Sequence, residues 1–137
     1  MNEQEFKNRT KNLALRVIKL VEALPKTRTA DIIGRQLLRC GTSVGANYRA
    51  TCRTRSMADV IAKLGIVEEE ADETLYWMDL LIEAGLVLPR RLDPVMKETD
   101  EILAMTVASI KTLRRRHGLG SQSKIKNQKS NRRSNHD

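Results

Sequence analysis

Apolar side chains recur along this chain at alternating steps of three and four residues, the spacing that places them on one face of an α-helix. Four segments carry such a stripe: Phe6–Leu24, Ala30–Thr51, Val60–Ile82 and Met96–Leu113. Pro25 ends the first segment, because proline has no N–H to donate to the preceding turn. The pattern predicts an all-helical chain.

Residues at the ends of these segments are typical of helix caps. Thr29 is the expected N-cap of the second helix, and Ser56, with a carboxylate three residues on, opens the third. Gly85 fits the end of the third helix, and Asp93-Pro94 fits the start of the fourth. The connections are short, so sequential helices should be antiparallel neighbours in an all-α, up-and-down four-helix bundle.

Length and composition indicate one domain followed by a tail. The chain has 137 residues, enough for a single core, and one Phe, one Trp and two Tyr leave that core aliphatic. Residues 1–117 form the predicted bundle domain, and Gly118 is the expected end of the fourth helix. Residues 118–137 are basic and contain two apolar side chains, too few to offset the ordering of their backbone, which predicts a disordered C-terminal tail.

The sequence favours a cytoplasmic protein. No apolar run approaches the roughly 20 residues that span a bilayer, and the first ten residues lack the apolar stretch of a signal peptide. Cys40 and Cys52 lie in one predicted helix about 18 Å apart, which is beyond disulfide reach. We therefore interpret both cysteines as reduced, small apolar residues.

Four residues of the second segment are unusual in a helix. Gly34, Gly41 and Gly45 share one face, and each glycine costs a helix about 1 kcal/mol. We expect a neighbouring helix to approach closely there; the alternative is a kink near Gly41. Asn47 lies on the apolar stripe, where it either specifies register and oligomeric state or bonds to a nearby backbone group.

Charge is unevenly distributed. The formal net charge is +8, of which Arg114 to the C-terminus contributes +7 and the preceding residues +1. Within the predicted bundle, Lys26–Arg55 carries +6 and Ser56–Ala84 carries −7. We expect these two segments to attract each other within a chain or across a subunit boundary.

No group of residues resembles an active site. The histidines are His117 and His136, so the Glu-x-x-His pairs of a di-metal bundle cannot form. Carboxylates at 68–70, Asp72 and Glu73 point in different directions around one helix and cannot converge on an ion alone. The sequence predicts no catalytic, cofactor or metal site and no enzyme.

Some apolar side chains lie off the main stripes, which is typical of a subunit contact. The alternative is a wide core of a compact monomer. The predicted interface residues are Leu15, Ile18, Ile66, Tyr76, Trp77 and Leu81.

Two stretches resemble a known family. They are LALRVIKLVEALPKTRTADIIGRQ and the longer LLRCGTSVGANYRATCRTRSMADVIAKLGIVEEEADETLYWMDLLIEAGLV. The step Ser43, Val44, Asn47 and the run Gly65–Trp77 are the most specific parts. Over roughly residues 6–114 the chain is similar to the small bacterial 23S rRNA-intervening-sequence proteins.

The resemblance implies an up-and-down bundle that assembles into a ring, typically a homopentamer. A related protein is an accessory factor of diversity-generating retroelements, where a basic ring surface engages nucleic acid and a reverse transcriptase. The family name records the genomic location of the genes and does not imply a ribosomal protein. No cofactor is implied.

Two functional hypotheses follow. In the first, an oligomeric module binds the backbone of RNA or DNA, with Tyr48 the one aromatic residue in its basic segments and with little sequence preference. Its candidate binding residues are Arg35, Arg39, Arg49, Arg53, Arg55, Arg114, Arg115 and Arg116. In the second, the acidic third helix and the apolar secondary faces bind a protein partner. Exposure of the second helix's arginines discriminates between them.

Overall fold

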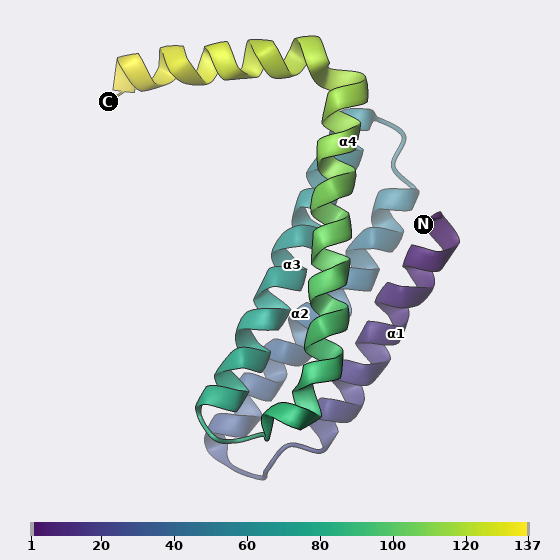
Figure 1. Ribbon diagram of the computed structural model, residues 1–137, viewed down its shortest axis with the longest axis vertical. Helices are drawn as coiled ribbons and strands as arrows, with labels where there is room; N and C mark the ends of the chain where they lie inside the picture. The colour runs from purple at the N-terminus through teal and green to yellow at the C-terminus, as the bar shows by residue number, and fades with distance from the viewer. Residues whose placement is uncertain (1, 137) are drawn as a thin grey trace.

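The chain forms four consecutive helices. The computed structural model describes residues 2–136, with side chains described for residues 2–117. The helices are α1 Glu3–Glu22, α2 Arg28–Cys52, α3 Met57–Glu83 and α4 Pro89–His136. Each helix packs against the next, and α4 returns alongside α1 with far fewer contacts (Figure 1). The predicted up-and-down four-helix bundle is confirmed.

The fourth helix extends further in both directions than predicted. It begins at Pro89 rather than at Asp93-Pro94, which lets Leu92 pack fully buried in the core. Pro94 is therefore inside the helix, in its second turn, where it removes one backbone hydrogen bond. The helical backbone continues past Gly118 to His136.

The side chains of residues 118–137, which the sequence predicts to be disordered, lie outside the described part of the chain. Their disorder therefore stays a prediction. The division of the chain into a bundle domain, residues 1–117, and a tail also stays a prediction.

Side-chain caps fix the helix starts. The side-chain oxygen of Asn2 accepts a hydrogen bond from the backbone N–H of Glu5 at 2.8 Å. That of Ser56 accepts one from the backbone N–H of Asp59 at 3.2 Å. Thr27, rather than the predicted Thr29, caps α2 and accepts from the N–H of Ala30 at 3.1 Å. Starting α2 at Arg28 places Ala30 in the core, fully buried.

Helix α3 ends next to Gly85, as the sequence indicates. Gly85 has φ +72°, a backbone conformation that other residues rarely adopt. Its N–H donates to the carbonyl of Ile82 and the next N–H donates to the carbonyl of Leu81, at 2.9 and 3.0 Å. This pair of bonds is a Schellman motif, which satisfies two carbonyls that the helix end would leave unpaired.

The predicted stripes form the core. Buried apolar side chains come from all four helices, and they include Leu13, Leu37, Val67 and Ile102. Five buried threonines lie among them, and each hydroxyl donates to the carbonyl four residues earlier in its own helix. Asn47 does likewise, donating to the carbonyl of Ser43 at 2.8 Å, which supports the backbone-bonding interpretation of this residue.

The glycines of α2 face α1 at close range, and α2 is continuous, so the close-approach interpretation is confirmed over the kink. A methyl group on Gly41 would lie 2.9 Å from both Cγ atoms of Val17. On Gly45 it would lie 3.2 Å from the backbone oxygen of Thr10. The spacing of these glycines therefore determines how closely the first two helices pack.

A partly buried ion pair joins α1 to α4, where the bundle has few other contacts. The Arg9 guanidinium donates to both carboxylate oxygens of Glu98, with its Nε at 2.9 Å, and pairs with Glu101 at 3.2 Å. The hydrogen bond to Glu98 raises the pKa of Arg9, so this group stays charged at any physiological pH. The pair aligns the first and last helices.

Candidate nucleic-acid interface

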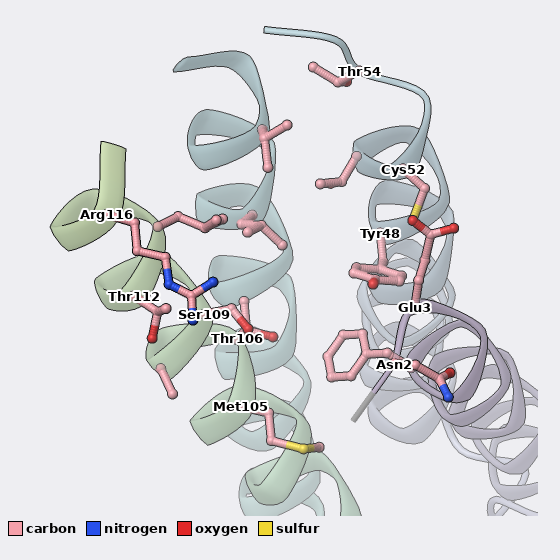
Figure 2. A pocket seen from close by; sticks show the side chains of 16 residues that line it. Asn2, Glu3, Tyr48, Cys52, Thr54, Met105, Thr106, Ser109, Thr112 and Arg116 are labelled. Atoms are coloured by element: carbon pink, nitrogen blue, oxygen red, sulfur yellow. The ribbon is translucent and has the colours of Figure 1, made fainter. Parts of the chain in front are cut away.

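The topology brings two separate basic clusters to one end of the bundle. Antiparallel packing places the start of α1, the end of α2, the start of α3 and residues 105–116 of α4 around one cavity (Figure 2). Arg49, Arg53 and Arg55 belong to the end of α2 and the turn that follows, and Arg114–Arg116 belong to α4. All six side chains are exposed. We refer to these six arginines as the basic end.

The arginines of the basic end are not held in ion pairs by the described side chains. None of its six arginines forms an ion pair with a carboxylate of residues 2–117. Glu3 is the one acidic residue that lines the cavity, and it pairs with Lys7 of its own helix at 3.5 Å. The arrangement leaves fixed positive charge available to an anionic partner.

Two predicted binding residues lie elsewhere on α2. Arg35 pairs with Asp31 one turn earlier, at 3.1 Å. Arg39 donates to Glu70 of α3 at 3.2 Å and also pairs with Glu73. The predicted attraction between the basic second helix and the acidic third helix is thus present within the chain at Arg39, while the arginines of the basic end stay free of it.

The cavity has a volume of about 760 Å³ and is lined by both apolar and polar side chains. On one wall, the Phe6 and Tyr48 rings pack edge to face with centroids 4.5 Å apart. Figure 2 shows Tyr48, Cys52 and Glu3 on this wall and Arg116 facing them from α4. Burial raises the pKa of the Tyr48 phenol and of the Cys52 thiol, so both groups are uncharged at neutral pH.

The described residues offer little for catalysis. Within residues 2–117, no group of three or more His, Cys, Asp or Glu side chains is placed to hold a metal ion. Cys40 and Cys52 are free thiols, the first fully buried and the second half-buried.

None of the helices in the described part of the chain is long and apolar enough to cross a membrane.

Comparison with known proteins identifies the family. The sequence model of the 23S rRNA-intervening sequence proteins matches residues 2–108. This chain belongs to that family. The match includes the arginines at the end of α2 and stops before Arg114–Arg116, so the second half of the basic end lies outside it.

A crystal structure supports the assignment. This intervening-sequence protein is similar to a protein of unknown function from the S23 ribosomal protein family of Bacteroides thetaiotaomicron. The two are 32% identical with a TM-score of 0.76, and the alignment covers 81% of this chain and 99% of that chain. No curated protein matches.

The predicted subunit-interface residues of this intervening-sequence protein have different environments. Leu15 and Ile18 on α1, and Ile66 and Tyr76 on α3, are exposed by 40–58%. These pairs lie on different faces, because α1 and α3 do not contact each other across the bundle.

The other two predicted interface residues are less accessible. Trp77 is half-buried, packs edge to face on Tyr76 and donates its indole N–H to Glu73 at 3.0 Å. Leu81 is fully buried in the core of its own chain, where a partner cannot reach it. The secondary-face assignment was wrong for Leu81, because α3 turns this position toward α2 and α4.

Sequence reasoning missed three exposed apolar residues, Ile32, Leu38 and Leu88. The first two belong to the doublets Ile32-Ile33 and Leu37-Leu38. Since neighbouring helical residues point about 100° apart, one member of each doublet leaves the buried stripe. The doublets were the signal that could have identified Ile32 and Leu38.

Proposed function

We propose that this protein is a non-enzymatic, oligomeric module that binds the phosphate backbone of RNA or DNA through its basic end. The observation that carries the proposal is the placement of six exposed arginines, from two distant segments, around one end of the bundle without partner carboxylates among residues 2–117. Arginine stays charged and its fork of donors matches phosphate oxygens.

Binding of this kind depends on phosphate and little on base sequence. Each phosphate neutralised by an arginine releases condensed counterions, which supplies most of the free energy of non-specific binding. Reading base edges would require an element that enters a groove, whereas Arg49, Arg53 and Arg55 lie at the end of α2 and in the turn that follows it. We therefore expect similar affinity for unrelated sequences.

The direct test is fluorescence anisotropy with labelled RNA and duplex DNA, each in two unrelated sequences of equal length. We expect saturable binding with Kd between about 10⁻⁴ and 10⁻⁶ M near physiological salt. The two sequences of each kind should differ by no more than about threefold. Absence of saturable binding to every probe would refute the proposed function.

The oligomer we propose is a ring, a homopentamer by family resemblance. Its support is the exposure of apolar side chains on two helices, Leu15 and Ile18 on α1 and Ile66 and Tyr76 on α3. Two different faces that contact each other head to tail generate a closed ring when the rotation between subunits closes. A ring would repeat the basic end once per subunit, and repeated sites increase avidity for a long polyanion.

A second candidate function is protein binding in the cytoplasm through α3. The observation that favours it is the exposed Tyr76 next to the exposed carboxylates Asp72 and Asp79. Together with the half-buried Leu75 and with Met96, Lys97 and Asp100 of α4, these side chains line a shallow groove between α3 and α4. Failure of nucleic-acid binding would leave this candidate as the stronger one.

A further inference from the structure

We propose that the cavity at the basic end holds an unstacked base of a single-stranded nucleic acid, so that the protein prefers single strands to duplexes. The inference rests on the proposed function and adds the class of ligand. It follows from three properties of the cavity: its size, its aromatic wall and the charges around its rim.

The cavity has the dimensions and lining of a ligand site. Its volume of about 760 Å³ falls within the roughly 300–1,000 Å³ typical of small-molecule pockets. Val60 and Leu64 of α3 and Leu113 of α4 contribute apolar lining, which suits the flat face of a base. A base in a duplex is stacked and paired, so only a single strand or a disrupted pair can deliver one to such a cavity.

Tyr48 supplies the stacking surface. It is half-buried, lines the cavity and is held by its edge-to-face contact with the buried Phe6 ring. Every base has a π-face, so stacking on an aromatic side chain tolerates any sequence. Tyr48 is also the one aromatic residue in the basic segments of the sequence, and the fold places it inside this cavity rather than on the outer surface.

The rim supplies the charges that the adjoining phosphates require. Arg116 reaches from α4 into the opening, opposite Tyr48, with the hydroxyls of Ser109 and Thr112 beside it (Figure 2). The other arginines of the basic end are outside the cavity lining, on α2, in the turn after it and on α4. A base in the cavity therefore places its flanking phosphates next to guanidinium groups.

The test uses three labelled probes of about twelve nucleotides. They are oligo-dT, an abasic strand with the same number of phosphates, and a duplex. We expect the unaltered protein to bind oligo-dT at least about fivefold more tightly than the abasic strand, the lower end of the stacking contribution of one base. Tyr48→Leu should remove this difference and leave the abasic affinity unchanged. The control Leu88→Ala, at an exposed apolar residue just before α4 at the opposite end of the bundle, should keep it.

Several results would overturn the inference. Equal affinity of the unaltered protein for oligo-dT and the abasic strand would rule out base capture and leave backbone binding intact, whereas no binding to any probe would also end the proposed function. If circular dichroism shows that Tyr48→Leu does not fold, Ser109→Leu fills the cavity from the opposite wall and serves as the second variant. Persistence of the oligo-dT preference in a folded cavity variant would place the base elsewhere.

Discussion

Replacing Arg49, Arg53 and Arg55 together with glutamine is expected to weaken RNA binding by roughly 100-fold near 0.15 M salt. The logarithm of the binding constant falls with the logarithm of the salt concentration by about 0.7–0.9 for each phosphate contacted. At about 0.15 M salt, each lost contact therefore lowers the binding constant by a factor of about four to five. The three side chains are exposed and make no ion pair within residues 2–117, so the fold should tolerate their loss. Anisotropy titration of one labelled RNA measures the change.

The matched control removes the same charge from the opposite end of the bundle. Arg28, Arg90 and Arg91 are exposed at the start of α2 and the start of α4. Glutamine at these three positions lowers the net charge by the same amount and should change RNA affinity by less than about threefold, an effect of overall charge alone. Equal weakening by both triple variants would show that total charge, rather than the basic end, drives binding.

Gly41→Ala and Gly65→Ala should change stability in opposite directions, with a difference of about 2–3 kcal/mol between the two variants. At Gly41 the new methyl would meet both Cγ atoms of Val17 at 2.9 Å. Because a β-branched side chain is stiff, we expect an overpacking cost in the upper part of the usual range, about 2–3 kcal/mol. The gain of about 1 kcal/mol in helix propensity offsets only part of that cost. We expect a net destabilisation of about 1–2 kcal/mol.

Gly65 is the internal comparison, because a methyl group there meets nothing within 4 Å in the middle of α3. The same gain in helix propensity, about 1 kcal/mol, should appear at this position as net stabilisation. Urea denaturation at one fixed protein concentration measures both variants, since subunit association would shift apparent stability with concentration. A Gly41→Ala protein as stable as Gly65→Ala would contradict the close packing of α1 on α2.

The fold could be predicted from the sequence because most of its determinants are local. Stripes of 3.6-residue period, the Ser56 cap and the Gly85 stop each act within a few residues, and they fixed the helices and their order. Errors arose where two local signals competed. Thr27 and Thr29 are both good caps, and Pro89 and Pro94 both fit a helix start, so burial of Leu92 and Ala30 decided between them.

The candidate site was less predictable because it depends on packing between helices. The sequence identified the arginines of the second and fourth helices as two clusters, without showing that the end of α2 and Arg116 line one cavity. It also grouped Arg39 with them, although a contact with α3 compensates its charge. Leu81 shows the same limit, since a periodic stripe gives the width of the buried face only approximately.

We expect the folded bundle, rather than its C-terminal tail, to bind nucleic acid. The most direct test is a salt titration of RNA binding with the full-length protein and with a form ending at His117, which keeps all six arginines of the basic end. Both forms should bind, with log Kobs falling against log salt at a slope of roughly −4 to −5 if six phosphates are contacted. Loss of binding on truncation, or a slope near zero, would show that the bundle is not the binding element.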